Sequence, residues 1–423
     1  MEFTSTRGCA PTVDIARALE AGLAPDGGLY VPVALPRFDA EAFDAAASLP
    51  ALATRIMAPF FAGSPLAARL DPICRDALDL PLPLDVMSGD APAWLLELFH
   101  GPTAAFKDFA ARFLARCLGA LRTDPAVEQT VLVATSGDTG AAVAAAFHRQ
   151  PGFRVVILYP EGRVSDRQAH QLGAFGDNVW TFRVQGSFDD CQRLAKQALG
   201  DPEMVRRHGL TSANSISIGR LLPQISYYAL AAVRLGAQAP VDVIVPTGNL
   251  GNALACILAR DMGFPIRRVY LATNANRTLP EYFAGAEYQG RAGLRTLANA
   301  MDVGDPSNFE RLAWFYRDRN PRDAGICAES IDDEAIKSCI RREHETHGRI
   351  VCPHTACALE LLARLRASGH RQPAVVAATA HPAKFETVIE PVIGQPIPLP
   401  PALSELLAQS SHADPLEPDL DAL

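Results

Sequence analysis

The sequence lacks the features that mark several large classes of protein. No run within its 423 residues approaches the ~18 uncharged apolar residues of a membrane helix, and its start shows no basic-then-apolar secretory signal. Basic residues are the minority, with 39 Lys and Arg against 47 Asp and Glu, which leaves a net charge of −8. The lack of a long apolar run leads us to expect no membrane partner. Because a nucleic-acid backbone is bound by a basic surface, the acidic balance leads us to expect no nucleic-acid partner.

Cysteine is sparse and follows no pattern. Nine cysteines are scattered along the chain, and no two of them form a CxxC pair. An odd number of irregularly spaced cysteines is typical of reduced, mostly buried thiols, so we predict a cytoplasmic protein. Repeats and low-complexity tracts are also missing, and 48% hydrophobic and 20% charged residues are ordinary for a globular chain of two or three domains.

From about residue 93 onward, the chain alternates apolar β-branched runs with Ala- and Leu-rich stretches. The runs include residues 131–133, 155–158, 241–245 and 374–378, and the helical stretches include 141–147 and 253–259. Continuous apolar strands that alternate with helices indicate an α/β protein whose parallel sheets are buried on both faces.

The two ends of the chain differ from this pattern. The first ninety residues indicate a mainly helical region with breaks near Pro25, Pro32 and Pro36, followed by a connector at residues 80–84. Residues 395–401 and the acidic segment 414–423 are predicted to form a surface tail.

Lys107 has unusual neighbours in a predicted helix that opens after a turn at residues 100–103. The residues one and two helical turns away are Ala110, Ala111 and Leu114. Apolar surroundings and the positive end of the helix dipole both favour the neutral amine that a Schiff-base lysine needs. From this segment alone, a lysine whose stem covers apolar surface while its ammonium reaches water is the simpler interpretation.

Two segments each combine an apolar strand, a turn rich in hydroxyl groups and glycine, and a helix. Their turns are residues 135–140 and residues 247–252. Free N–H groups at a helix start can hold an anion, although such a turn alone is more often plain connecting structure. Neither turn is a Walker loop or a GxGxxG motif.

A third segment and a strand end add polar groups. Asn214, Ser215 and Arg220 suit a phosphate or carboxylate, or else they form an exposed loop that caps a helix starting near Leu221. Thr379 ends the last apolar run, where its hydroxyl either faces a ligand crevice or caps the next helix.

The histidines are less informative. Residues 344–347 are one residue short of HExxH, so we predict no metal site. His354 is interpreted as a structural turn histidine, with a catalytic role as the alternative.

Together these segments resemble the threonine synthase family, which consists of pyridoxal-phosphate enzymes with the tryptophan-synthase-β-like fold (fold type II). The resemblance runs from residues 5–8 and 26–30 to about Leu403. Its most specific stretches are residues 100–109, 135–140, 212–220, 299–303 and 379–385.

The resemblance implies two open, mostly parallel sheets flanked by helices. It implies a mainly helical N-terminal region at residues 1–90. It further implies a large cofactor-binding domain at residues 91–128 and 213–423, and a small α/β domain at residues 129–212.

The resemblance also implies a role for each candidate residue. Lys107 falls on the catalytic lysine that forms the internal aldimine with pyridoxal 5'-phosphate, and Asp138 and Thr379 fall near the cofactor ring and its nitrogen. The loop that cradles the cofactor phosphate is matched by Gly248, Asn249, Leu250, Gly251 and Asn252. The substrate-binding positions are matched by Ser136, Thr139, Asn214, Ser215 and Arg220.

The implied reaction converts O-phospho-L-homoserine and water to L-threonine and phosphate, in a monomer or homodimer that binds this small molecule. Leu250 and Asn252 stand where the family usually has Phe and Asp, and Cys352 replaces a more usual acidic residue. These departures leave open a specialised paralogue acting on a related phospho- or phosphono-amino acid. A serine or threonine lyase of the same fold and a non-catalytic binding protein are further alternatives.

Overall fold

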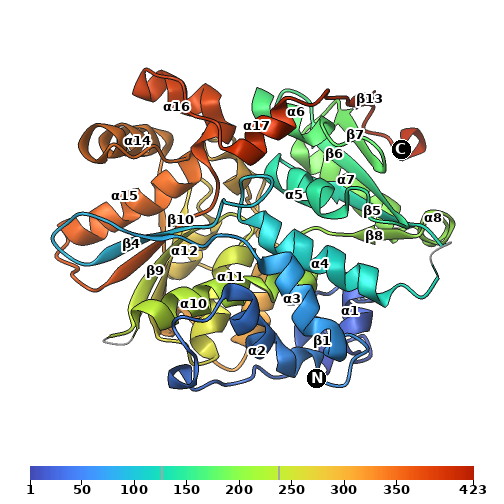
Figure 1. The fold of residues 1–423 in the computed structure, drawn as a ribbon, viewed down its shortest axis with the longest axis horizontal. Coiled ribbons are helices and arrows are strands. Elements are labelled where there is room, and N and C mark those ends of the chain that lie inside the picture. The colour runs from blue at the N-terminus through green and yellow to red at the C-terminus, as the bar shows by residue number, and fades with distance from the viewer. Residues whose placement is uncertain (125–126, 237–238) are drawn as a thin grey trace.

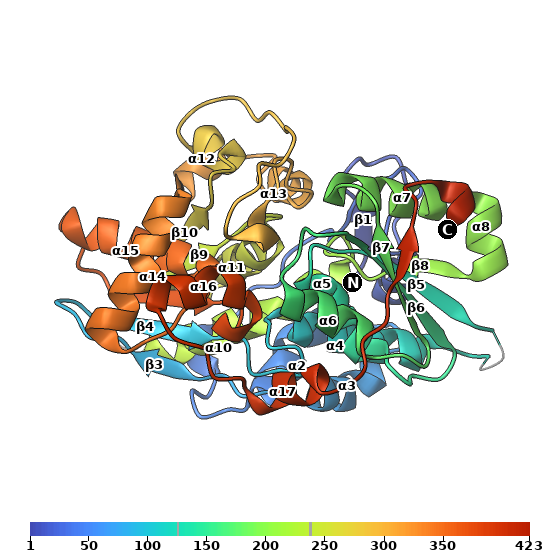
Figure 2. The ribbon, with the colours of Figure 1, turned by 90° about the horizontal axis from the view of Figure 1, so that it is seen from above.

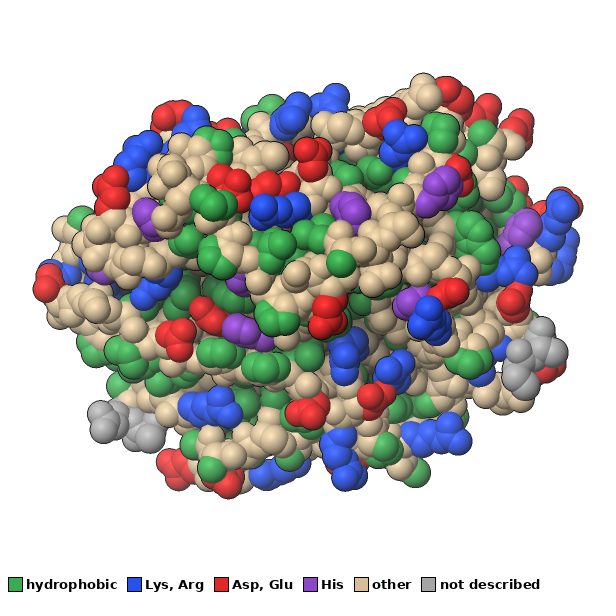
Figure 3. Space-filling model, turned by 45° about the horizontal axis from the view of Figure 1, so that its top comes forward, with side chains coloured by type: hydrophobic (Ala, Val, Ile, Leu, Met, Phe, Trp, Pro, Cys, Tyr) green, Lys and Arg blue, Asp and Glu red, His purple; other side chains and the backbone are tan. Residues whose placement is uncertain are grey.

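The computed structural model describes residues 1–124, 127–236 and 239–423. Two α/β parts stand side by side, and the N-terminal region packs along the helices that join them (Figure 1). None of the described helices is both long enough and apolar enough to cross a membrane. On the face that Figure 3 presents, acidic and basic side chains are interspersed.

The larger sheet has the strand order β11-β10-β9-β12-β4-β3. Its strands are β3 (Leu84–Val86), β4 (Ala93–Glu97), β9 (Val241–Pro246), β10 (Ile266–Thr273), β11 (Ile326–Ser330) and β12 (Ala374–Ala378). Neighbouring strands are parallel, except that β3 and β4 are antiparallel. Every residue of β9 and β12 is buried, since α15 (Pro353–Ala367) covers one face and α11 (Gly251–Asp261) the other (Figure 1). The apolar runs therefore predicted these strands correctly.

The smaller sheet is parallel throughout, with the order β13-β7-β6-β5-β8. Its strands are β5 (Gln129–Ala134), β6 (Phe153–Pro160), β7 (Val179–Val184), β8 (Leu210–Ser212) and β13 (Asp414–Leu416). Its helices are α5 (Asp138–Phe147), α6 (Asp166–Gly173), α7 (Phe188–Gly200) and α8 (Pro202–His208). The first two helices face the larger part, and α7 and α8 cover the opposite side (Figure 2).

The prediction of a surface tail at the end of the chain was wrong for residues 414–416. These residues form β13, which pairs with β7 at the edge of the smaller sheet. Leu416 is 6% exposed and packs on the core of that sheet, which explains why the segment is held there.

The N-terminal region contains α1 (Ile15–Ala21), α2 (Leu49–Phe61) and α3 (Leu70–Leu78), and is mainly helical as expected. It also contains an antiparallel pair, β1 (Phe3–Ser5) with β2 (Tyr30–Pro32), which the sequence analysis did not predict. The remaining helices are α4 (Lys107–Leu121), α9 (Ile218–Leu221), α10 (Gln224–Leu235), α12 (Thr278–Phe283), α13 (Phe309–Phe315), α14 (Asp333–His347), α16 (Glu386–Ile393) and α17 (Pro401–Leu407). Short 3-10 turns are η1 (Ala40–Ala42), η2 (Ala67–Arg69), η3 (Asn299–Met301), η4 (Pro321–Asp323), η5 (Pro382–Phe385) and η6 (Leu420–Ala422).

The strand order places the candidate residues at one edge of the larger sheet. From β9 the chain proceeds outward to β10 and β11, and then returns to insert β12 between β9 and β4. Open α/β sheets bind ligands beyond the carboxyl ends of their strands, at the point where the strand order reverses. The segments after β4, β9 and β12 carry Lys107, the loop 247–252 and Thr379, so all three converge on this point.

Candidate active site

Lys107 is the first residue of α4 and lies beside the carboxyl end of β12. The N–H of Phe106 donates to the carbonyl oxygen of Thr379 at 2.9 Å, which joins the start of α4 to the residue that follows β12. The Lys107 side chain is 16% exposed. Burial lowers the pKa of Lys107, and nearby positive charges lower it further, although Asp138 acts in the opposite direction. The predicted position at a helix start is correct, and its surroundings favour an uncharged amine.

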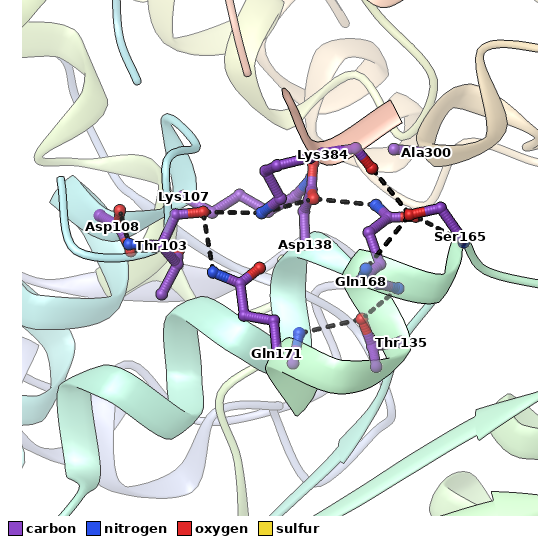
Figure 4. Close-up of polar contacts among 12 residues, drawn as sticks. Thr103, Lys107, Asp108, Thr135, Asp138, Ser165, Gln168, Gln171, Ala300 and Lys384 are labelled. Carbon is purple, nitrogen blue, oxygen red and sulfur yellow. Dashed lines mark hydrogen bonds and ion pairs between the residues drawn. The ribbon is translucent and has the colours of Figure 1, made fainter. Parts of the chain in front are cut away.

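Asp138, at the start of α5, lies between the buried Lys384 and the partly buried Lys107 (Figure 4). Its Oδ1 is 2.9 Å from Nζ of Lys384, and its Oδ2 is 3.7 Å from Nζ of Lys107. Nε2 of Gln168 donates to Oδ1 at 3.0 Å. Burial acts to raise the pKa of Asp138, but the charges of the two lysines outweigh burial and hold that pKa well below its usual range. Asp138 is therefore ionised at neutral pH.

The turn before α4 is held by Thr103 and Asp108. The Asp108 carboxylate accepts the N–H of Thr103 at 2.9 Å and its hydroxyl at 2.6 Å. The carbonyl oxygen of Thr103 in turn accepts hydrogen bonds from Nζ of Lys384 at 2.7 Å and from Nε2 of Gln171 at 3.3 Å. These bonds fix the backbone immediately before the cofactor-lysine candidate.

In the turn after β5, residues 135–140, a side chain of the turn accepts hydrogen bonds from the turn's own backbone. Oγ1 of Thr135 accepts the N–H groups of two glycines of the turn, at 3.0 and 2.9 Å. Gly137 has a φ of +127°, a conformation that favours glycine. Among the described residues, the half-buried hydroxyls of Ser136 and Thr139 have no hydrogen-bond partner, which leaves both free to bind a ligand.

The turn after β9, residues 247–252, leaves its N–H groups available. Within the described part of the chain, none of the N–H groups of residues 248–252 has an acceptor, and they lie at the start of α11. Leu250 has a φ of +64° and its side chain is 1% exposed in the core. A Cβ on Gly248 would lie 2.6 Å from the Cα of Met301, so only glycine fits there. The turn thus presents backbone donors to an anion.

Two asparagines of this turn have different partners. Nδ2 of Asn249 donates to Oγ of Ser215 at 2.7 Å, which connects the turn to the third predicted loop. Oδ1 of Asn252 accepts the hydroxyls of Tyr227 at 2.6 Å and Tyr228 at 3.0 Å, while its buried Nδ2 has no partner within residues 1–124, 127–236 and 239–423. The Asn252 amide therefore acts as an acceptor for two hydroxyls and keeps a buried donor available.

The third loop holds a buried arginine with unused hydrogen-bonding capacity. Arg220 is 3% exposed, and Nη1 donates to the carbonyl of Ala213 at 2.5 Å. Its Nε, together with Oδ1 of Asn214 and Oγ of Ser217, is buried without a partner among the residues that the structure describes. The helix predicted to start near residue 221 instead begins at residue 218, which places Arg220 inside it. Burial lowers the pKa of Arg220 to about 10, so it stays cationic at neutral pH.

His354 is buried near the start of α15. Its Nε2 accepts the N–H of Ala300 at 3.1 Å, and its buried Nδ1 has no partner in the described part of the chain. Burial lowers the pKa of His354 to about 4, so the ring is uncharged at neutral pH. The accepting role of Nε2 places the ring hydrogen on Nδ1.

The sequence analysis did not anticipate Arg311, which supports two of the loops. The side chain is fully buried and donates to the carbonyls of Tyr30 at 3.1 Å and Ile216 at 2.6 Å, and to Oδ1 of Asn308 at 2.8 Å. Nδ2 of Asn308 donates to the carbonyl of Asn249 at 3.1 Å. Arg311 thus ties the N-terminal region to the loops after β8 and β9.

Lys384 was also missed, although the sequence holds a signal for it. It follows Thr379 by five residues, and it is one of only four lysines in the chain. A lysine in an otherwise apolar segment, in a chain with so few of them, marks a position worth testing.

Comparisons with known proteins agree with this arrangement. A family model described as "Pyridoxal-phosphate dependent enzyme" matches residues 81–380. Models described as "Threonine synthase N terminus" and "Threonine synthase, C-terminal" match residues 2–78 and 355–423. The threonine synthase of Serratia marcescens is 39% identical over 396 residues, which cover 93% of this chain and 91% of that protein.

Solved structures show the same similarity. The crystal structure of threonine synthase from Escherichia coli superposes with a TM-score of 0.92 at 36% identity, covering 100% of this chain and 98% of that one. The pyridoxal-phosphate-bound threonine synthase from Brucella melitensis gives a TM-score of 0.90 at 35% identity, with 100% and 97% covered.

The residues of this site fit pyridoxal 5'-phosphate, the cofactor of these enzymes. The unpaired N–H groups of residues 248–252 and the free Nδ2 of Asn252 suit its phosphate. The amine of Lys107 suits its aldehyde, because burial favours the uncharged form. The two attachment points therefore come from segments that the larger sheet brings to one edge.

Proposed function

The chain belongs to the threonine synthase family of pyridoxal-phosphate-dependent lyases, and we propose on that premise that its substrate is O-phospho-L-homoserine. The products are L-threonine and phosphate. One observation supports this choice most directly: the 2.7 Å hydrogen bond between Asn249 and Ser215 joins two anion-binding loops. A cofactor phosphate and a substrate phosphate require two such loops side by side, whereas a substrate without phosphate requires one.

The residues of the site divide the chemistry among them. Pyridoxal phosphate, when bound, stabilises negative charge on the carbon atoms of an attached amino acid. Lys107 holds the cofactor and, once released from it, moves protons at Cα and Cβ of the substrate. The hydroxyl of Thr379 would help to hold the cofactor ring at its nitrogen, and Asp138 would help to hold the ring.

The substrate is held by polar side chains of the turn after β5 and of the loop after β8. Ser136 and Thr139 offer hydroxyls to its carboxylate. Asn214, Ser215 and Arg220 bind its phosphate, and the buried cationic side chain of Arg220 stabilises the charge that accumulates as phosphate leaves.

The departures from the family pattern lie in supporting positions. The Leu250 side chain packs in the core, and Asn252 is bonded to two tyrosines. Cys352 precedes α15, where its Sγ accepts the N–H of Thr355 at 3.4 Å, so it caps the helix as an acidic residue would. These positions give no support to a paralogue with altered substrate choice.

Product analysis tests the proposal. The holoenzyme is incubated with O-phospho-L-homoserine, and we expect threonine and inorganic phosphate in equal amounts. Lys107→Ala should form neither product and should lose the adduct that borohydride traps. Phosphate without threonine would reject the reaction, and a trapped adduct on a lysine other than Lys107 would reject the assignment of the site.

We further propose a cytoplasmic location, a monomer or homodimer, and the domain division given above, with β13 added to the small α/β domain. All nine cysteines are unpaired and seven are buried, which supports a reducing compartment. Strands β5 to β8 fall within residues 129–212, which supports that boundary. Sedimentation of the purified protein distinguishes monomer from dimer.

A further inference from the structure

We infer that Lys384 is a positioning residue that occupies the Asp138 carboxylate and thereby leaves Lys107 as an uncharged amine. The inference rests on the proposed function only in taking Lys107 as the lysine that holds the cofactor. An amine needs a free electron pair to bond to an aldehyde carbon, with water as the leaving molecule, and a protonated lysine has none.

Lys384 lies closer to the Asp138 carboxylate than Lys107 does. The Lys384 side chain is 1% exposed, and its Nζ lies 2.9 Å from Oδ1 of Asp138 while donating to the carbonyl of Thr103 at 2.7 Å (Figure 4). Nζ of Lys107 lies 3.7 Å from Oδ2, beyond normal hydrogen-bond length. Lys384 therefore holds the carboxylate at closer range, with a second acceptor fixing its ammonium.

The charges around Lys107 do not allow two ammonium groups. Among the described residues, Asp138 is the one carboxylate within 4 Å of either lysine. The other groups that act on Lys107 are Lys384 from η5 and Arg220 from α9, both positive, and His354 from α15 is uncharged. A buried positive charge without a counter-ion is costly, so the lysine with the weaker partner loses its proton.

The backbone around Lys384 is held firmly enough to fix this arrangement. Oγ of Ser165 donates to the carbonyl of Lys384 at 2.7 Å, and Nη1 of Arg167 donates to the carbonyl of Ala383 at 2.8 Å. Both partners lie at the start of α6, beside the smaller sheet. A purely structural role, that of tying the two parts together, is the competing explanation, and it predicts no change in the protonation of Lys107.

The test measures the protonation of Lys107 in the full-length chain after the cofactor has been removed. Trace acetylation with acetic anhydride is followed from pH 6 to 10, and the modified lysines are quantified by peptide mass spectrometry. Lys337, whose side chain is 40% exposed and pairs with Glu334, is the internal reference in the same samples. In the wild type, we expect the midpoint for Lys107 to lie below that for Lys337.

Lys384→Met removes the ammonium, so Asp138 becomes the partner of Lys107 alone. We expect the Lys107 midpoint to rise by at least about one pH unit, which is a tenfold smaller uncharged fraction at neutral pH. Lys384→Gln, which can still donate to Thr103, should give the same rise. Lys384→Arg keeps the charge and should leave the midpoint within a few tenths of a unit.

A double variant separates charge from packing. Adding Asp138→Asn to Lys384→Met removes the counter-ion as well, so the midpoint should return to or below the wild-type value. Circular dichroism verifies that each variant is folded. An unchanged midpoint in a folded Lys384→Met or Lys384→Gln variant overturns the inference. If the midpoint shifts as expected but the wild-type holoenzyme makes no threonine from O-phospho-L-homoserine, the proposed function is overturned instead.

Discussion

The turn after β5 and the turn after β9 are built from similar residues, since each joins a buried strand to a helix through hydroxyl groups, glycine and a short polar side chain. They differ in what they present. In the first turn, Thr135 accepts two of the backbone N–H groups, and the charged group of the turn is the buried Asp138 carboxylate. In the second turn, the N–H groups of residues 248–252 have no acceptor among the described residues, and none of these five residues carries a charge.

This difference shows that a strand–turn–helix pattern does not by itself define an anion site. The carboxylate of the first turn pairs with amines and two of that turn's N–H groups are already bonded, whereas the second turn attracts a phosphate through its backbone. A single hydroxyl, that of Thr135, accounts for much of the contrast because it consumes donors that would otherwise be available.

The largest expected effect is on cofactor affinity, after a substitution that distorts the turn after β9. In Gly248→Val the added side chain would collide with the backbone of Met301, because a Cβ there lies 2.6 Å from its Cα. The displaced N–H groups should lower affinity for pyridoxal phosphate about a hundredfold. Titration of the cofactor-free chain, followed by absorbance, measures the change. Unaltered affinity in a folded variant would show that the phosphate is held elsewhere.

Arg220→Ala tests the loop that is bonded to the second turn. Loss of a buried charged hydrogen-bond donor should cost about 2 kcal/mol, or about thirtyfold in kcat/KM for O-phospho-L-homoserine. Cofactor affinity should stay unchanged, because the backbone donors of residues 248–252 are intact. Exposed Arg206→Ala serves as the matched control. If cofactor and substrate affinity fell together, Arg220 would be a structural residue.

Thr135→Val tests whether the Thr135 hydroxyl stabilises the turn after β5. The change keeps the shape of the side chain but removes the acceptor of two buried N–H groups. We expect the free energy of unfolding in urea to fall by about 1.5 kcal/mol. Thr139→Val, which alters a hydroxyl without a partner in the same turn, should change stability by less than about 0.5 kcal/mol. Equal losses in both variants would contradict this account.

The smallest effect concerns pH and the support of the second turn. Asp302 follows Met301, and burial raises its pKa to about 7, with Asp333 adding to the rise. The folded chain then keeps a proton that the unfolded chain has lost, so stability declines as the pH rises from about 4 to about 7. Asp302→Asn should remove about 1 kcal/mol of this decline once solvent screening is considered. Unfolding free energies at several pH values measure it, and an unaltered slope would reject the role of Asp302.

The sequence predicted both turns and their flanking strands and helices, because each of these elements is formed by residues close together in the chain. The apolar runs of β5, β9 and β12 and the glycine-containing turns predicted where strands end and helices begin. Lys107 was placed correctly at a helix start, since its apolar neighbours lie within two helical turns.

What was missed depends on contacts between distant segments. Lys384 meets Asp138 across most of the chain, and Arg311 reaches Tyr30 from further still, so no periodicity signals either pair. Strand β13 was misjudged because its sequence, Asp-Pro-Leu, offers a single apolar residue. Such short polar strands are determined by the edge they join.

The insertion of β12 between β4 and β9 has a consequence for the order in which the molecule matures. β4 leaves the ribosome early, but the strand that connects it to β9 is among the last to be made. Pairing of segments so far apart in a chain is slow, because the entropy of closing a long loop is lost before the stabilising contacts form. Lys107 and Thr379 therefore meet late in folding, and a nascent chain should capture the cofactor only after β12 has been inserted.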